Sequence, residues 1–402
     1  MMDHFVVIGA GQAGCQLVAR LRSEGFTGAI TLIGEEAVPP YQRPPLSKAY
    51  LLGDMPLERL FLRPESFYAD QNITLKLATK VDRIDPAARQ VHLASGEVIS
   101  YDKLALTTGS TPRRLPQSIG GHLPGVLVMR DLKDADAMAP ALVAGKKVVI
   151  IGGGYIGLEG AAVCAKKGLD VTLVEGAPRI LQRVACAETS DYFRVLHQSR
   201  GVRVIEGVGV NCITGADHAT GVELADGTFL PADIVVLGVG ITPNSQLAEA
   251  AGLTIDNGIW TDEYARTSDA NIYAAGDCAS AMFKGQRLRI ESVGNAIDQA
   301  DAAARNMLGK DIPYTPKAWF WSDQYDCKLQ IAGLNIGYDK VVVRDDGKTR
   351  SHWYYAGDQL IALDAMNDPR AYMVGKRLID AGKTVDPALV ADAGSDLKAF
   401  LQ

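Results

Sequence analysis

The sequence predicts an α/β protein with two Rossmann-like domains and a small α+β domain at the C-terminus. Residues 3–35 read as a strand, a glycine-rich turn, an amphipathic helix and a strand that ends in acid, and residues 146–175 repeat this order. Beyond Pro313 the pattern changes to aromatic residues and alternating strands. The duplicated βαβ unit indicates the two similar domains, and the last segment indicates the third.

Each duplicated unit is followed downstream by a strand that ends in small residues, over 101–109 and over 233–240. These strands return the chain from one domain to the next. A further buried strand over 270–277 and a helix from about Ser292 to Leu308 belong to the first domain. The expected domains are a discontinuous first one over 1–108 and 241–311, a second over 109–240 and a C-terminal one over 312–402.

Charge and composition exclude several classes of protein. The formal net charge is −6, which disfavours a nucleic-acid-binding or anionic-membrane-binding surface. The N-terminal residues carry no basic, cleavable leader pattern, and no long uncharged apolar run follows, so we expect a cytoplasmic protein without a membrane span. The six cysteines are scattered singly and the histidines lack metal-ligand spacing, which predicts no metal, cluster, disulfide or redox dithiol. The chemistry therefore needs an organic cofactor.

The first glycine-rich turn is Gly9-Ala10-Gly11-Gln12-Ala13-Gly14, between an apolar strand and a helix. Gly9 permits the tight turn, Gly11 lets the backbone approach a pyrophosphate, and Gly14 lets helix and strand pack closely. The next strand ends at Glu35, which suits the hydroxyls of a ribose. A glycine-rich turn alone is often only a tight corner, but the complete order of strand, turn, helix, strand and acid favours a dinucleotide site.

The second turn is Gly152-Gly153-Gly154-Tyr155-Ile156-Gly157, and its strand-end acid is Glu175. A carboxylate there accepts hydrogen bonds from an unphosphorylated ribose and repels a 2′-phosphate, so the sequence favours NADH over NADPH. Arg179 and Arg183 lie nearby in the sequence and weaken this preference without reversing it.

Six segments carry a family resemblance: residues 9–14, 40–48, 152–159, 273–279, 289–293 and 319–324. Together they resemble the putidaredoxin reductase-like, FAD-dependent ferredoxin reductases of oxygenase systems, which are glutathione-reductase-like flavoproteins. The resemblance spans essentially the whole chain. It implies that NADH gives a hydride to FAD, which then passes single electrons to a [2Fe-2S] ferredoxin that feeds a haem monooxygenase or a ring dioxygenase.

The strand Tyr273-Ala274-Ala275-Gly276-Asp277 indicates which of the two nucleotide sites binds the flavin. In the family that the chain resembles, such an Asp binds a ribityl hydroxyl, and the following helix points its positive end at the flavin. The alternative is an Asp that caps the helix after it. The order of the motifs favours the flavin, so we expect FAD in the first site and NADH in the second.

Lys48 and Glu159 are the candidate catalytic residues, because the resemblance places them together near flavin N5. For Lys48 the alternative is a proline-stiffened surface loop, and for Glu159 an acid in the first turn of a helix. Tyr155 shields the flavin or packs its helix, and Trp321 and Trp319 wall the flavin or fill a core. Arg43 is a candidate phosphate partner.

The other cofactor contacts follow from the motifs and the resemblance. Those expected for FAD are Gly9, Gly11, Gln12, Ala13, Gly14, Glu35, Arg43, Lys48, Val81, Thr108, Gly109, Arg130, Gly276, Asp277, Val293 and Trp321. Those expected for NADH are Gly152, Gly154, Tyr155, Ile156, Gly157, Glu159, Glu175 and Gly240.

The sequence also bears on the electron acceptor. No cysteine lies between Cys15 and Cys164, so electrons leave the flavin directly and not through a thiol. Ferredoxins of this type are acidic, and we expect a transient, electrostatic complex. Candidate docking cations are Arg287, Arg289, Arg305 and Lys328. Asp301 is acidic at a helix position where a base would favour docking, and it argues against this surface. Two other readings stay open: an NADH oxidase or small-molecule reductase, and an NADH-sensing flavoprotein of the apoptosis-inducing type.

Overall fold

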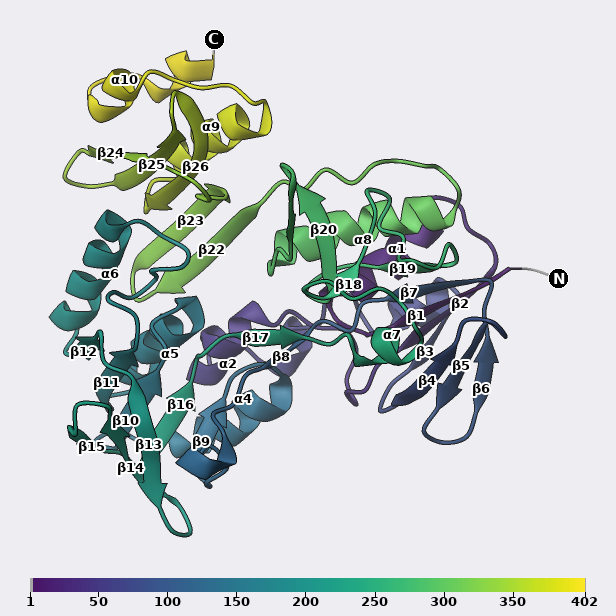
Figure 1. The fold of residues 1–402 in the computed structure, drawn as a ribbon, viewed down its shortest axis with the longest axis horizontal. Coiled ribbons are helices and arrows are strands. Elements are labelled where there is room, and N and C mark those ends of the chain that lie inside the picture. Colours follow the sequence, from purple (N-terminus) through teal and green to yellow (C-terminus); the bar gives the residue numbers. More distant parts are fainter. Residues whose placement is uncertain (1–2, 402) are drawn as a thin grey trace. The chain divides into compact units, whose positions relative to one another are not determined.

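The computed structural model describes residues 3–401, which form two compact units (Figure 1). Unit 1 comprises the chain up to Gln42, Leu57–Thr111 and Thr242–Ala318. Unit 2 comprises Arg43–Pro56, Pro112–Ile241 and the chain from Trp319 onward. The C-terminal segment thus shares a compact unit with the second glycine-rich turn, and the three-domain division at residues 108, 240 and 311 stays a prediction.

Unit 1 is built on a parallel sheet. The sheet order is β19 (Ile272–Ala274), β7 (Lys103–Leu106), β1 (His4–Ile8), β2 (Ala29–Ile33) and β3 (Ile73–Lys76). Ile8 pairs with Ile33 and with Leu106, so three strands end at one edge of the sheet. Ligands of such sheets bind outside the carboxyl ends of the strands, and the first glycine-rich turn lies there.

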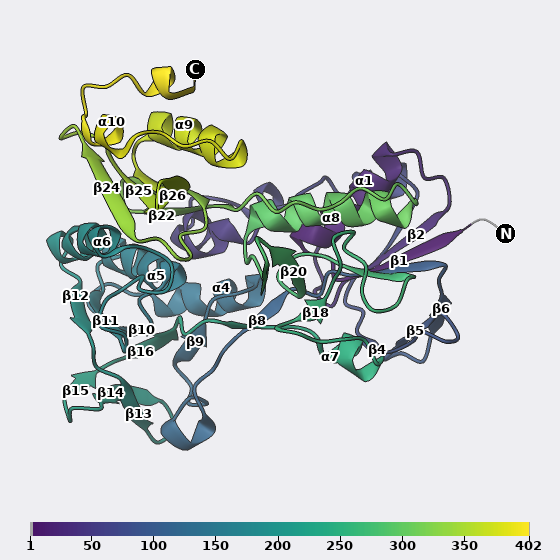
Figure 2. The same cartoon turned by 45° about the horizontal axis from the view of Figure 1, so that its top comes forward.

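Alternation along β1 fills both faces of this sheet. Phe5 and Val7 pack with α1 (Gln12–Ser23) and α8 (Val293–Met307), which lie side by side in both views (Figures 1 and 2). Val6 and Ile8 pack on the other face with the antiparallel sheet of β4 (Val81–Asp85), β5 (Gln90–Leu93) and β6 (Val98–Ser100).

Unit 2 repeats the parallel sheet, which confirms the predicted duplication. Its order is β12 (Arg203–Glu206), β11 (Asp170–Glu175), β10 (Lys147–Ile151), β16 (Ile234–Leu237) and β9 (Val126–Val128). The helices α5 (Tyr155–Lys166) and α6 (Ala187–Ser199) supply Leu158 and Phe193 to its largest core.

The C-terminal segment forms an antiparallel sheet with helices, which confirms the predicted α+β character. The sheet order is β22 (Trp319–Gln324), β23 (Cys327–Gly333), β26 (Gln359–Met366), β25 (Arg350–Ala356) and β24 (Lys340–Asp345). Leu329 and Ile331 of β23 belong to the same core as Leu158 of α5, whereas Trp353 of β25 packs with α9 (Pro369–Asp380). The sheet is therefore joined through its core to the helix that follows the second glycine-rich turn.

Other helices are α2 (Ala49–Leu52), α3 (Ser66–Asp70), α4 (Leu132–Met138), α7 (Gln246–Ala250) and α10 (Pro387–Ala391). Other strands are β8 (Ser110–Pro112), β13 (Val210–Gly215), β14 (Ala219–Leu224), β15 (Phe229–Pro231), β17 (Ile241–Pro243), β18 (Ile259–Trp260), β20 (Ala279–Phe283) and β21 (Gln286–Leu288). Within residues 3–401, every helix is too short or too polar to cross a lipid bilayer.

Candidate functional site

The turn between β1 and α1 in unit 1 has the shape of a pyrophosphate cradle. Gly9 has a φ of 112°, and a Cβ added there would collide with the backbone oxygen of Thr107. A Cβ on Gly14 would collide with the backbone oxygen of Gly9. At Gly11, by contrast, a Cβ would meet nothing within 4 Å, and no side chain caps the helix that starts there. The helix N-terminus is therefore open to an anion, as FAD requires.

The turn between β10 and α5 in unit 2 repeats this geometry. Gly152 has a φ of 109°, and an added Cβ would collide with the backbone oxygen of Gly238. Gly157 is pressed against the backbone oxygen of Gly152. Gly154 again faces open space, and α5 begins there without a side-chain cap. The two turns fit two dinucleotides equally well.

The strand-end acids differ in their surroundings. Glu35 is exposed just beyond β2. Glu175 ends β11, and its two carboxylate oxygens accept hydrogen bonds from the backbone N–H of Gly153 at 2.6 Å and of Ala177 at 2.7 Å. Each oxygen keeps a further acceptor position for a ribose hydroxyl. Arg179 donates to the Cys186 carbonyl and the Ser190 hydroxyl, so its guanidinium is engaged within the fold.

The motif around Asp277 is not a helix cap. Asp277 Oδ2 accepts a hydrogen bond from Ser110 Oγ at 2.9 Å, and β20 follows it in the chain. The next long helix, α8, is capped instead by Ser292, whose side chain accepts from the Asn295 N–H. The alternative interpretation of Asp277 as an N-cap is therefore wrong. The predicted contact Val293 is the first residue of α8.

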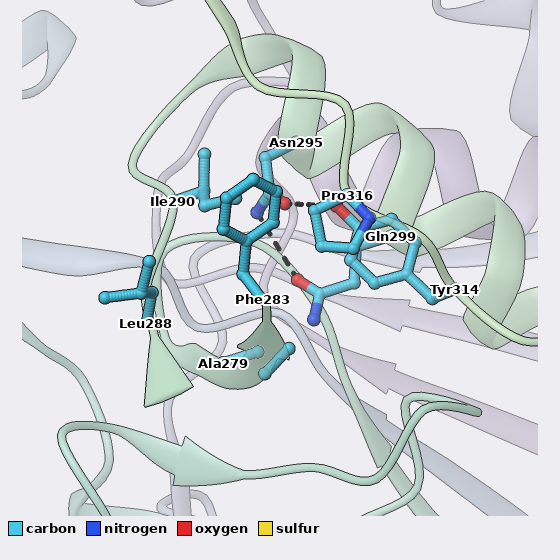
Figure 3. Close-up of a pocket in the computed structure, with 9 residues that line it drawn as sticks. Ala279, Phe283, Leu288, Ile290, Asn295, Gln299, Tyr314 and Pro316 are labelled. Atoms are coloured by element: carbon cyan, nitrogen blue, oxygen red, sulfur yellow. Dashed lines mark hydrogen bonds between the residues drawn. The ribbon is translucent and has the colours of Figure 1, made fainter. Parts of the chain in front are cut away.

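Gly276 lies beside the first glycine-rich turn. Its φ is 84°, and an added Cβ would lie 3.2 Å from the Cβ of Ala13. Its N–H donates to Gln299 Oε1 at 2.9 Å. Gln299 also lines a hollow at the start of α8, beside Asn295 and Tyr314, with space for about one water molecule (Figure 3). The predicted contacts Gly276 and Ala13, far apart in sequence, are thus neighbours in unit 1.

The other predicted FAD contacts are distributed over both units. Thr108 donates to the Asn244 carbonyl at 2.6 Å and precedes Gly109, whose φ is 68°. Val81 is buried in β4. In unit 2, Arg43 Nη1 donates to the backbone carbonyl of Arg130 at 2.9 Å, so these two residues are neighbours.

Lys48 and Glu159 form an ion pair in unit 2, in which the carboxylate is buried and the lysine is partly buried. Lys48 Nζ lies 2.7 Å from Glu159 Oε2, and only 3% of Glu159 is exposed. Two hydroxyls that were not among the predicted site residues also donate to this carboxylate: Ser47 Oγ at 2.9 Å and Ser322 Oγ at 2.7 Å. The readings of Lys48 as a solvated loop cation and of Glu159 as an ordinary helix-end acid are therefore wrong. A buried charge with three donors is held in one position.

The aromatic residues divide into two groups. Trp319 and Trp321 stack with ring centroids 5.5 Å apart and stay partly exposed, whereas Trp353 is fully buried in the core. Tyr155 opens α5 beside the exposed Ile156, and burial raises the pKa of its hydroxyl. The two stacked tryptophans therefore do not fill the core of the C-terminal sheet, which the sequence left open.

Cys186, His352 and Asp364 lie together in unit 2, although nothing in their spacing predicts it. All three are buried, and their potential ligand atoms lie within 4.8 Å of one another. The Thr189 hydroxyl contacts each of them: His352 Nδ1 at 2.7 Å, Asp364 Oδ2 at 2.7 Å and Cys186 Sγ at 3.3 Å. The position that a metal ion would take among them is thus filled by a hydroxyl, which indicates a structural hydrogen-bond network.

The predicted docking cations of unit 1 have acidic partners there. Arg305 pairs with Glu24 at 2.8 Å, Arg289 with Glu291 at 2.9 Å and Arg287 with Asp256 at 3.4 Å. Asp301, the acid that argued against a basic docking patch, is paired with Arg20 at 2.5 Å. Lys328 is exposed on β23 of unit 2. The docking surface stays a prediction.

Two family models match this chain. Residues 3–300 match the model described as pyridine nucleotide-disulphide oxidoreductase, and residues 319–401 match the one described as reductase C-terminal. The chain therefore belongs to the pyridine nucleotide-disulphide oxidoreductase family, and it is an FAD- and NAD-dependent oxidoreductase.

Within the family, the chain is similar to ferredoxin reductases over its full length. It is 44% identical to rhodocoxin reductase of Rhodococcus erythropolis, over 98% of this chain and 93% of that protein. It is 41% identical to putidaredoxin reductase of Pseudomonas putida, over 99% and 97%. The structure of a covalent putidaredoxin reductase–putidaredoxin complex matches with a TM-score of 0.96 and 40% identity, over 99% of this chain and 98% of that one. The resemblance seen in the sequence is confirmed.

Proposed function

We infer that this chain is an NADH:ferredoxin reductase that oxidises NADH at an FAD and delivers electrons singly to a [2Fe-2S] ferredoxin of an oxygenase system. The observation that carries this inference is the combination of two open pyrophosphate cradles with an ion pair between Lys48 and the buried Glu159. Full-length similarity to ferredoxin reductases supports a ferredoxin as partner. One relative is the reductase component of an anthranilate 1,2-dioxygenase system, which supports an oxygenase, a haem monooxygenase or a ring dioxygenase, as the final acceptor.

Bound FAD supplies the step from two-electron to one-electron chemistry. The chain's own residues would bind and orient the two nucleotides. The N-termini of α1 and α5 would hold the pyrophosphates, Asp277 would accept a hydrogen bond from the ribityl chain, and Glu175 would accept those of the NADH ribose. Glu159 fixes the ammonium of Lys48, which would provide positive charge for the reduced flavin. The segment 40–48 contains no cysteine, so no thiol takes up the electrons.

The proposed function is tested with the purified yellow protein under anaerobic conditions. NADH should bleach the flavin absorbance, and an acidic [2Fe-2S] ferredoxin should reoxidise it much faster than oxygen does. Turnover should fall with rising salt, because charged surfaces steer the encounter. Reoxidation by oxygen at the same rate would favour an NADH oxidase. NADH-induced dimerisation without turnover would favour a sensing flavoprotein of the apoptosis-inducing type.

Substitution of the two open glycines should separate the two nucleotide sites. Gly154→Val places a side chain where NADH phosphates would lie, so the variant should retain FAD and lose most of its NADH affinity. Gly11→Val should be purified without FAD. Since a Cβ at either glycine meets no atom of a more distant residue within 4 Å, both variants should fold. Flavin content from the visible spectrum and NAD⁺ binding by calorimetry check this; loss of FAD from Gly154→Val would contradict the assignment.

Glu175 should set the preference for NADH. In the double variant Glu175→Ala, Gly176→Arg, the repelling carboxylate is lost and a guanidinium is gained. A Cβ at Gly176 would meet only the Cα of Gly209 at 3.8 Å, so the new side chain has space. One charge-assisted hydrogen bond corresponds to about a tenfold change. We expect the ratio of kcat/KM for NADPH to NADH to rise at least about tenfold, and an unchanged ratio would reject this role.

We also propose that the protein works in the cytoplasm. Its six cysteines are all free thiols, five of them buried. Unpaired cysteines are typical of reducing compartments. Fractionation of the source cells, with the flavoprotein followed by antibody, checks this.

A further inference from the structure

A chain of buried polar side chains in unit 2 leads to the carboxylate of Glu159. Ser322 Oγ, which donates to Glu159 Oε1 at 2.7 Å, accepts a hydrogen bond from Gln324 Nε2 at 3.0 Å. Gln324 Oε1 lies 2.8 Å from His197 Nε2, and His197 Nδ1 lies 3.3 Å from the Tyr325 hydroxyl. Ser322, Gln324 and His197 are fully buried. They come from β22 and α6, which are far from Glu159 in sequence.

The hydrogen bonds of this chain all run in one direction. The Gln324 amide nitrogen donates to Ser322, so its oxygen faces His197 and accepts. His197 must then carry its proton on Nε2. Burial lowers the pKa of His197, so the ring is neutral and its Nδ1 accepts from Tyr325. Each donor therefore points toward Glu159, and hydrogen bonds aligned in this way polarise one another.

The outer end of the chain lies near the surface. Tyr325 is partly exposed, and the Arg200 guanidinium lies 5.4 Å from its ring centroid. The inner end is the one carboxylate oxygen of Glu159 that Lys48 does not contact, since Lys48 and Ser47 both donate to Oε2. Glu159 is thus held from two sides: by the Lys48 segment on Oε2 and by the C-terminal sheet on Oε1.

We propose that Ser322, Gln324 and His197 are positioning residues for the reductase reaction, which hold the Glu159 carboxylate in the orientation in which it binds the Lys48 ammonium. This proposal rests on the proposed function and adds to it the part that the C-terminal segment takes in flavin reduction. The alternative is that the three residues only join β22 to α6 and satisfy one another. The two possibilities differ in whether their effect passes through Glu159.

A double-mutant cycle separates these possibilities. Gln324→Leu removes both hydrogen bonds of the amide at similar volume, and Tyr355→Phe is the matched control. Tyr355 is equally buried in the C-terminal sheet, and its hydroxyl donates only to the Val385 carbonyl at 3.0 Å. We expect Gln324→Leu to slow anaerobic flavin reduction by NADH about tenfold and Tyr355→Phe to leave it unchanged. In a Glu159→Gln background, Gln324→Leu should have no further effect.

A second readout does not depend on activity. Nitrogen-15 NMR of labelled histidines should show His197 as the neutral Nε2–H tautomer, and its Nε2–H resonance should move in Glu159→Gln. His352 is an internal control, because Arg350 donates to its Nε2 at 3.0 Å and its proton is therefore on Nδ1. A His197 resonance unmoved by Glu159→Gln, or equal slowing by Gln324→Leu in both backgrounds, would overturn the proposal. A wild-type protein whose flavin is not reduced by NADH would contradict the proposed function instead. The His197 resonance would still test whether these hydrogen-bonded side chains are coupled to Glu159.

Discussion

Lys48→Met should slow reduction of the flavin by NADH by about 100-fold, the loss typical of a preorganised charge at a reaction centre. Methionine keeps the length of the side chain and removes its charge. The Glu159 side chain is buried, with 4% exposed, and only 18% of the Lys48 side chain is exposed, so solvent screens the pair less than a surface pair. Stopped-flow absorbance under anaerobic conditions measures the rate.

Lys76→Met is the matched control for this experiment. Lys76 pairs with Glu97 at 2.9 Å, but 48% of the Glu97 side chain is exposed. Exposed pairs contribute about 0–1 kcal/mol, so this variant should match the wild type in both rate and stability. Lys48→Met leaves Glu159 buried beside two hydroxyls, and Lys48→Met, Glu159→Gln should regain stability without regaining rate. A Lys48→Met variant that reduces at the wild-type rate would remove Lys48 from the mechanism.

The stability of the protein between pH 4 and 6.5 should depend on two opposed groups in the Thr189 network. Burial raises the pKa of Asp364 to about 6, against hydrogen bonds from Tyr354 and Thr189. Burial lowers the pKa of His352 to about 4, assisted by Arg350. The stabilising contribution of Asp364 is fully present below its unfolded pKa of 3.8, and it is lost as pH rises to about 6. The contribution of His352 is present above 6.5 and is lost as pH falls to about 4.

Replacing one of these two groups should reveal how the free energy of unfolding changes with pH because of the other. Each shift corresponds to about 3 kcal/mol. Relative to the wild type, Asp364→Asn should therefore gain about 3 kcal/mol of unfolding free energy as pH rises from 4 to 6. His352→Asn should lose a similar amount over the same range. Urea unfolding of the FAD-loaded protein at stepped pH measures both. Two variants with the same pH dependence as the wild type would show that neither group is shifted.

The sequence alone determined the features that arise from local sterics. A glycine with φ above 100° that touches neighbouring backbone, as at Gly9 and Gly152, admits no other residue. The two turns, the duplicated βαβ unit and the family resemblance could therefore be read directly. The resemblance also paired Lys48 with Glu159, but the residues alone left both open to ordinary surface roles.

The tertiary structure decided what depends on contacts between distant segments. Lys48 and Glu159 are separated by 111 residues, and Ser322 reaches Glu159 across 163. Burial of this carboxylate among three donors depends on how β22 and α5 pack, which no local pattern records. The same holds for Asp277, which is followed by β20 and bonded to Ser110, and for the Thr189 network. Backbone geometry is determined by the types of neighbouring residues. The burial and pairing of charges are determined only when segments remote in sequence pack together and exclude water.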